Sequence, residues 1–282
     1  MSRRNRDVPE ADSRASRRYH DRVARQYDSI YDDPYWDFHD RLTWESVKPL
    51  LPRDLSAPVS DLGCGTGKWG LKLLKSGFHT TFLDNAAAMI EEVRKKLEAQ
   101  GPRAKRATMV VNDIVAMNDL PDAHFALTLA MGDPLSICSD PVAAAREMFR
   151  ITRPGGVVIA TADNKLAAID HFVERGSLDA LEEFVNTSKT RWLTADDKER
   201  FELTTFTPHT LRKLFEKSGF EVISLIGKPV IPVRQNKMLL SKPDSIERLL
   251  KVEAELSKDP TSPARAGHLQ VTARRPVLPT SE

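Results

Sequence analysis

The sequence contains very little cysteine, and this scarcity excludes two kinds of protein. Its 282 residues include only Cys64 and Cys138. Secreted domains stapled by disulfides need several cysteines, and structural zinc sites need cysteine and histidine clusters at short spacings, which this chain lacks. We therefore expect neither a disulfide framework nor a metal site, and we predict a reducing, cytoplasmic location.

Long apolar runs and a strong excess of one charge are also missing. The first segment, MSRRNRDVPEADSRASRR, is charged and lacks the apolar stretch of a secretion signal. No later segment approaches the ~18 apolar residues that cross a bilayer. With 42 basic and 40 acidic residues, the formal net charge is only +2, which predicts no strong attraction to nucleic acid. We expect neither a membrane span nor a nucleic-acid partner.

What the chain does contain is an alternation of short apolar, β-branched runs with helical stretches. Strand-like runs such as PVSDL, HTTFLD and HFALTLAM alternate with helix-like runs such as AAAMIEEVRKKLEAQ. This alternation is typical of βαβ units and a mainly parallel sheet. The sequence therefore predicts an α/β fold with a doubly wound, Rossmann-like sheet.

The same pattern divides the chain into segments. We predict a disordered tail at 1–12, an N-terminal helical lid at 13–57, a core at 58–163, an insert at 164–206, more core at 207–227, a second insert at 228–266, a last core strand at 267–276 and a tail at 277–282. Both inserts exceed ordinary connection lengths. Because ligands bind at the carboxyl ends of such strands, the helical inserts are candidate substrate caps, with surface elaboration as the alternative.

The stretch PVSDLGCGTGKWG, residues 58–70, places three glycines between a predicted strand and a predicted helix. Glycines at this point let backbone N–H groups approach a ligand closely. The order does not match the phosphate-binding loop GxxxxGK[ST]. It also departs from the dinucleotide fingerprint G-x-G-x-x-G, because Lys68 stands where the third glycine belongs.

The run D-L-G-C-G-T-G instead resembles the first motif of the class I S-adenosylmethionine (SAM)-dependent methyltransferases. The resemblance is strong over 58–163 and weaker over 206–226. It implies SAM as cofactor, S-adenosylhomocysteine (SAH) as product and a seven-stranded sheet with an antiparallel last strand. A carboxylate ahead of the loop, at Asp61, complements the ammonium group of SAM and would repel a phosphate. HFALTLAM departs from the family, which usually opens its fourth strand with an acidic residue.

Further cofactor contacts follow from the resemblance at the ends of the next strands. Asp84 matches the acidic residue that binds the ribose hydroxyls, with helix capping as the alternative. Asp113 and Ile114 match the adenine contacts, and Met89 fits either the adenine side or the core. The predicted cofactor-binding residues are Tyr27, Asp61, Gly63, Cys64, Gly65, Gly67, Asp84, Asn85, Met89, Asp113, Ile114 and Met131.

The acceptor is less well defined. The run GDPLS after the fourth predicted strand has one proline and no aromatic residue, unlike the motif of enzymes that methylate base amines. A strongly basic body is also missing. We predict direct displacement at the sulfonium methyl, onto O, N, S or C of a small molecule. Candidate general bases are Asp133, His39 and His171, although a packed or exposed position explains each as simply.

Three alternatives stay open at this point. The first alternative is a methyltransferase whose acceptor is quinone-like or lipid-like, as in the ubiquinone and menaquinone methyltransferases. The second is a protein that binds SAM without turnover. The third is a nicotinamide-dependent dehydrogenase, and Lys68 at the position of the third glycine argues against it. Tyr27, Tyr31, Tyr35 and Trp36 are dense enough for an aromatic lid over the cofactor, or for ordinary packing. The sequence does not indicate an oligomeric state.

Overall fold

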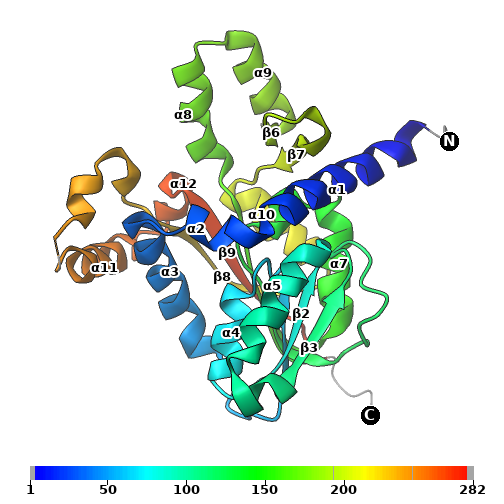
Figure 1. The fold of residues 1–282 in the computed structure, drawn as a ribbon. Coiled ribbons are helices and arrows are strands. Elements are labelled where there is room, and N and C mark those ends of the chain that lie inside the picture. The colour runs from blue at the N-terminus through cyan, green and yellow to red at the C-terminus, as the bar shows by residue number, and fades with distance from the viewer. Residues whose placement is uncertain (1–3, 193, 243, 278–282) are drawn as a thin grey trace.

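A seven-stranded sheet forms the centre of the computed structural model, which describes residues 4–192, 194–242 and 244–277 (Figure 1). Its strands are β1 (Pro58–Leu62), β2 (His79–Asp84), β3 (Ala107–Val111), β4 (Phe125–Ala130), β5 (Thr152–Asp163), β8 (Glu221–Lys228) and β9 (His268–Arg274). They lie in the order β3-β2-β1-β4-β5-β9-β8. The neighbours from β3 to β5 are parallel, whereas β9 is antiparallel to both β5 and β8. The predicted sheet is confirmed.

Helices pack around this sheet, and some of them project beyond one end of it. They are α1 (Arg4–Val23), α2 (Tyr27–Ile30), α3 (Pro34–Val47), α4 (Lys68–Lys75), α5 (Ala87–Glu98), α6 (Pro134–Ile137), α7 (Pro141–Ile151), α8 (Lys165–Arg175), α9 (Leu178–Thr187), α10 (Pro208–Lys217), α11 (Ser245–Leu256) and α12 (Ser262–Arg265). Short 3-10 turns are η1 (Ala24–Gln26), η2 (Lys48–Leu50), η3 (Gly101–Arg106), η4 (Asp197–Glu199), η5 (Val233–Gln235) and η6 (Lys237–Leu240). None of the helices in the described parts of the chain has the length and apolar character needed to span a bilayer.

The core lies on both faces of the sheet because consecutive strand residues point in opposite directions. All of β4 is buried, as expected for a parallel strand covered on both sides. Leu129 packs in the apolar cluster that includes side chains of α3 and α4. Its neighbour Ala130 packs in the opposite cluster, with α7 and α10. These two layers fix the carboxyl ends of β1, β2, β4 and β5 side by side.

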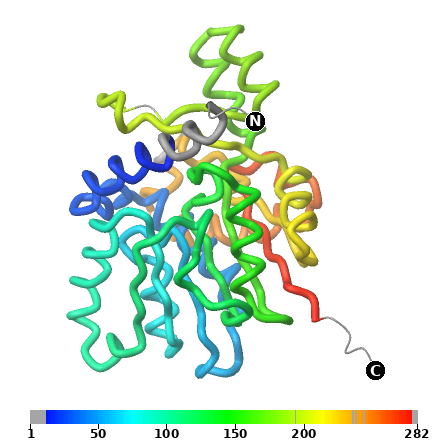
Figure 2. Tube along the Cα trace, turned by 90° about the vertical axis from the view of Figure 1, so that its right-hand side faces the viewer, coloured from blue at the N-terminus to red at the C-terminus, as the bar shows by residue number. Residues whose placement is uncertain are grey.

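Figures 1 and 2 show how the added segments gather around one end of the molecule. The blue helix α1 crosses this end, and α8 and α9 project beyond it as a helical hairpin. After α9, the first insert forms a two-stranded sheet, β6 (Lys189–Trp192) with β7 (Phe201–Thr204), which the sequence did not predict. Arg22 of α1 donates two hydrogen bonds of 2.7 Å to Glu199 in this insert. The insert therefore supports α1.

The N-terminus differs from the sequence prediction. The sequence predicted a disordered tail at 1–12, but α1 begins at Arg4, so residues 4–12 are helical; residues 1–3 lie outside the described residues. The turn predicted at RPGG is also wrong, because these residues belong to β5, where the register with β4 shifts. The remaining segment boundaries stay predictions.

Candidate cofactor and acceptor site

The glycine loop connects β1 to α4 and passes close to the segment that follows β4. The Cys64 N–H donates to the Leu83 carbonyl at 2.9 Å, which ties the loop to the end of β2. Gly63 has a φ of +61°, which L side chains rarely adopt. A Cβ at Gly63 would lie 2.7 Å from the Cβ of Pro134, so the two loops touch only because this residue has no side chain.

Gly63→Ala should therefore destabilise the protein by about 2–3 kcal/mol, from backbone strain plus overpacking. Gly101→Ala is a matched control, because Gly101 also has positive φ, +57°, but a Cβ there would meet no atom within 4 Å. Backbone strain alone should cost about 1 kcal/mol. Urea unfolding of both variants measures the difference. Equal losses would show that the contact with Pro134 contributes nothing.

Asp84, at the end of β2, fixes the far side of the loop. One carboxylate oxygen accepts from the Gly65 N–H at 2.8 Å and the other from the Ala86 N–H at 2.9 Å. Burial raises the pKa of Asp84, against the lowering influence of His20 and of these two N–H groups. Each oxygen retains a second lone pair, so the carboxylate can still accept hydrogen bonds from a ligand.

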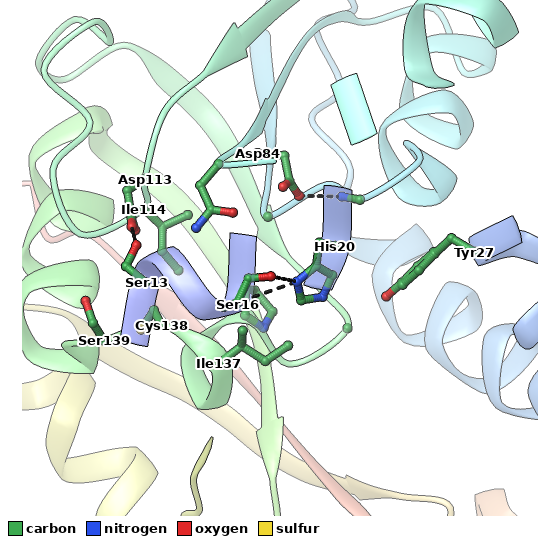
Figure 3. A pocket seen from close by; sticks show the side chains of 15 residues that line it. Ser13, Ser16, His20, Tyr27, Asp84, Asp113, Ile114, Ile137, Cys138 and Ser139 are labelled. Atoms are coloured by element: carbon green, nitrogen blue, oxygen red, sulfur yellow. Dashed lines mark hydrogen bonds between the residues drawn. The ribbon is translucent and has the colours of Figure 1, made fainter. Parts of the chain in front are cut away.

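Two pockets meet at this loop. Pocket A, of about 590 Å³, is shown in Figure 3 and lies between α1, the ends of β1 and β2, and the loops after β3 and β4. It is lined by Ser13, Ser16, His20, Tyr27, Gly63, Gly65, Asp84, Asn85, Asp113, Ile114, Gly132, Pro134, Ile137, Cys138 and Ser139. Its edge is closed by α1, because Ser13 Oγ donates to Asp113 Oδ2 at 2.6 Å.

Pocket B, of about 840 Å³, continues from pocket A on the other side of the loop. It is lined by Tyr27, Asp28, Tyr31, Trp36, His39, Asp40, Thr43, Gly63, Cys64, Gly65, Thr66, Lys68, Trp69, Met131, Gly132, Asp133 and Thr161. The pockets share Tyr27, Gly63, Gly65 and Gly132. The sequence offered four aromatic residues as a lid. Two of them, Tyr31 directly after α2 and Trp36 of α3, form one wall of pocket B.

The shape and chemistry of the joined pockets fit SAM. A Cβ at Gly132 would meet no atom within 4 Å, so the bare backbone there opens onto shared space. Asp84 offers carboxylate oxygens beside pocket A, which suits a ribose diol. Asp28, Asp40 and Asp133 line pocket B and place carboxylates near a cationic sulfonium and ammonium, although Asp28 is paired with Lys96 and Asp40 with Lys68, each at 2.6 Å.

Most of the predicted cofactor residues reach these pockets. The lining includes Tyr27, Gly63, Cys64, Gly65, Asp84, Asn85, Asp113, Ile114 and Met131. Gly67 lies outside both linings and caps the start of α4 in a left-handed conformation. Met89 is fully buried against Val23, Ala24 and Ala86, which favours the core alternative. Their direct contact with the cofactor stays a prediction that this geometry does not favour.

Asp61 lies beneath the loop rather than on a pocket wall. Its Oδ2 accepts from the Gly70 N–H at 2.6 Å, while its Oδ1 is buried without a hydrogen-bond partner. Burial raises the pKa of Asp61 to about 7, and Asp84 adds to the rise. Because Oδ1 has no protein partner, the interaction of Asp61 with the ammonium group of SAM stays a prediction. The Gly70 bond gives Asp61 a second task, which is to hold the first turn of α4 against β1.

Beyond pocket B, the register of three strands lines up a row of ionisable side chains. His268 opens β9 and pairs directly with Asp163 at the end of β5 on one side and with Lys228 at the end of β8 on the other. Directly paired residues of antiparallel strands project to the same face. Lys228 is 3% exposed and donates to Gln270 Oε1. Burial lowers the pKa of Lys228 to about 7, although Asp133 and Asp40 oppose the shift.

Asp133 adds a carboxylate to this row from the loop after β4. Its Oδ2 lies 2.7 Å from His268 Nδ1, and its Oδ1 is buried without a partner. Thr161 Oγ1 accepts a hydrogen bond of 2.9 Å from the Asp133 backbone N–H, and Asp133 has a left-handed φ of 63°. Burial would lower the pKa of His268, but the adjacent Asp133 and Asp163 carboxylates outweigh it and raise that pKa.

The two histidines predicted as bases lie in different environments. His39, on α3, lines pocket B, and both its ring nitrogens are buried without a hydrogen bond. Its Nδ1 lies 3.8 Å from Asp40, too far for one. Burial lowers the pKa of His39 to about 4, so the ring is neutral at physiological pH. His171 lies on the exposed face of α8, outside both pockets, and the structure gives it no place in the site.

Sequence reasoning missed several residues of the site. Ser13, Ser16 and His20 line pocket A from α1, and His268, Asp163 and Lys228 form the row behind pocket B. His268 is separated from Asp133 by 135 residues, and no local motif marks either the pair or the row. A row on three adjacent strands follows only from the sheet order and register, which the sequence pattern does not supply.

Comparison with known proteins agrees with this geometry. Residues 59–156 match the family model described as a methyltransferase domain. The chain is similar to the tRNA 5-carboxymethoxyuridine methyltransferase of Escherichia coli (strain K12), with 22% identity over 91% of this chain and 95% of the relative. It is 32% identical to the demethylmenaquinone methyltransferase of Mycolicibacterium paratuberculosis, over 52% of this chain and 61% of that protein.

The fold agrees as well. A putative S-adenosylmethionine-dependent methyltransferase from Listeria monocytogenes superposes with a TM-score of 0.59 at 18% identity, covering 84% of this chain and 98% of that one. These matches give no support to the nicotinamide-dependent alternative. The matched domain includes the glycine loop, Asp84 and Asp113, which are the residues that shape pocket A. The chain is a class I SAM-dependent methyltransferase, an enzyme with SAM as its cofactor.

Proposed function

We propose that the acceptor of this methyltransferase is a small molecule bound in pocket B. The observation that carries the proposal is the set of groups that converge on pocket B: Tyr31, directly after α2, and Trp36 of α3 line it, and His39 and Asp133 each have a buried polar atom without a protein partner. Concave pockets with aromatic walls and a few convergent polar groups are typical of small-molecule sites. SAM supplies an electrophilic methyl group; the chain holds the acceptor in line and excludes water.

The lining favours a polar acceptor over a quinone or another lipid-like one. Asp40, Lys68 and Asp133 all line pocket B, and Lys68 Nζ donates to Asp40 Oδ2 at 2.6 Å. An apolar tail would leave these charges desolvated, which is costly. The partial likeness to a demethylmenaquinone methyltransferase lies within the methyltransferase domain that many acceptors share.

A tRNA acceptor is the second candidate, because the relative similar over nearly the whole chain acts on tRNA. Arg17, Arg18 and Arg25 are exposed on α1 and η1, on the outside of the segment that closes pocket A. Against this candidate, the chain has a formal net charge of only +2. A base would also have to reach pocket B past the aromatic wall.

Methyl-labelled SAM separates the two candidates. The enzyme is incubated with label and either total tRNA or a protein-free extract of cell metabolites, and the acid-precipitable and acid-soluble products are counted. We expect label in acid-soluble products other than SAM and its breakdown products, and none in tRNA. Label in tRNA would replace this proposal with the second candidate. Enzyme inactivated by heat is the control for non-enzymatic methylation.

We also propose a reducing, cytoplasmic setting. Its support is that both cysteines, Cys64 and Cys138, are free in the structure. Burial raises the pKa of both thiols, so neither is poised for redox chemistry.

A further inference from the structure

The row behind pocket B contains a carboxylate–imidazole pair that cofactor binding does not explain. His268 Nδ1 lies 2.7 Å from Asp133 Oδ2, and its side chain is 16% exposed. No hydrogen bond to its other ring nitrogen, Nε2, occurs among the described residues. A carboxylate that holds one imidazole nitrogen fixes the tautomer and the ring orientation, and leaves the second nitrogen to accept a proton.

The ring of His268 lies directly against the walls of pocket B. Its centroid is 5.3 Å from that of His39 and 6.3 Å from that of Trp36. Both neighbours line the pocket. Asp133, which orients His268, lines it too, and comes from the same loop as Met131 and Gly132. His268 is not itself among the residues that line pocket B, but its side chain is partly exposed, so its ring lies at the edge of the pocket behind His39 and Trp36.

We propose that His268, oriented by Asp133, is the general base of this methyltransferase, and that its acceptor is a phenol-type hydroxyl. This inference rests on the proposed function, because it assigns the chemical class of the small molecule in pocket B. His268 Nε2 takes the hydroxyl proton. The acceptor oxygen forms a bond to the methyl carbon, while the carbon–sulfur bond breaks and its electron pair stays on the sulfur of SAH. The proton then leaves His268 for solvent.

The chemistry of the row argues against a carboxylate acceptor and suits a hydroxyl. A carboxylate is already ionised and needs no base, so a base pair would be redundant. Two basic side chains lie near the row: Lys228, and Arg234, whose guanidinium carbon lies 4.2 Å from the ring centroid of Tyr35 and 4.7 Å from that of Trp36. The same two cations stabilise the negative charge that develops on a hydroxyl oxygen. Tyr31 and Trp36 line pocket B, so aromatic side chains are available to a flat acceptor.

The charged groups that face His268 set its pH response. Asp133 and Asp163 raise its pKa, and Arg234 lowers it. Lys228 on β8 is its cross-strand neighbour, and His39 on α3 is its ring neighbour. A base acts only when it is unprotonated, so the rate should rise with pH through the raised pKa of His268. Asp133→Asn removes the carboxylate that raises the pKa of His268 most, so the rise of the rate with pH should move to lower pH.

A chromophoric phenol tests the proposal without knowledge of the natural acceptor. 4-Nitrophenol absorbs at different wavelengths as neutral molecule and anion, so its ionisation is read directly when it is titrated with SAH-saturated enzyme. We expect the bound probe to be ionised at a pH where the free probe is mostly neutral. His268→Gln should remove this ionisation, while calorimetry shows unchanged SAH affinity and therefore an intact fold. His209→Gln, an exposed histidine on α10, should behave as wild type.

Turnover supplies the second measurement. With SAM and unsubstituted phenol, whose hydroxyl is neutral at the working pH, His268→Gln should lower kcat by roughly 10²- to 10⁴-fold, as expected for loss of a general base. No binding of the probe to SAH-saturated enzyme, or a bound probe that stays neutral, would reject the phenol base. Equal spectra for wild type and His268→Gln would do the same. Label in tRNA would instead overturn the proposed function, so the two failures are distinguishable.

Discussion

Asp84→Ala should weaken SAH binding by about 100-fold or more. Two losses combine in this variant. The ligand loses a charged hydrogen-bond acceptor, which is worth roughly 1.5–3 kcal/mol. The Gly65 and Ala86 N–H groups also lose their partner, since both donate to this carboxylate, so the loop that lines both pockets is no longer fixed. Each 1.4 kcal/mol is tenfold in affinity. Titration calorimetry of both proteins with SAH measures the effect.

Asp170→Ala is the control. Asp170 is an exposed carboxylate of α8 that lines neither pocket. We expect at most a threefold change in SAH affinity, on the order of 0.6 kcal/mol. Urea unfolding of Asp84→Ala must show a folded protein before its affinity is interpreted. An affinity within threefold of wild type in folded Asp84→Ala would refute the assignment of this carboxylate to the ribose.

The cofactor side could be predicted from the sequence because its residues lie in short segments at the ends of consecutive strands. The glycine loop, Asp84 and Asp113 each follow a run whose apolar pattern marks a strand, and parallel strands bring those ends together. The pattern does not tell which side of a loop faces the ligand. Gly67 and Met89 match the expected segments in position, yet their bare backbone and thioether are used in helix capping and core packing.

The acceptor side could not be predicted in the same way. The Asp133–His268 pair depends on the placement of β9 between β5 and β8, after a long insert. The sequence predicted this last strand and its antiparallel direction, but not its register. A shift of β9 by one residue would turn His268 to the other face of the sheet. Candidate bases chosen by residue type alone therefore included the exposed His171 and omitted His268.

Lys228→Met should raise the free energy of unfolding at pH 7 by about 4 kcal/mol, less the contribution of the hydrogen bond that Lys228 no longer donates. The Lys228 amine is buried, and its folded pKa of about 7 lies far below the value of 10.5 for a free lysine. At neutral pH the unfolded chain holds a proton that the folded chain binds poorly, so the lysine favours unfolding. Gln270 Oε1 loses the Lys228 donor, and Ser46 Oγ, 3.2 Å away, has a single proton that also has the Thr43 carbonyl as an acceptor at 2.7 Å. An unpaired buried oxygen would reduce the gain by roughly 1–3 kcal/mol.

The sign of the pH dependence distinguishes this explanation from simple improved packing. Between pH 7 and 10.5 the unfolded state binds more protons at this lysine than the folded state, so wild-type stability should rise with pH. From pH 7 to pH 9 the advantage of Lys228→Met should shrink by about 2 kcal/mol. Urea unfolding at pH 7, 8 and 9 measures it, with Lys251→Met, an exposed lysine of α11, as control. A constant advantage at all three pH values would mean that Lys228 titrates normally. The conclusion that burial lowers the pKa of Lys228 would then be wrong.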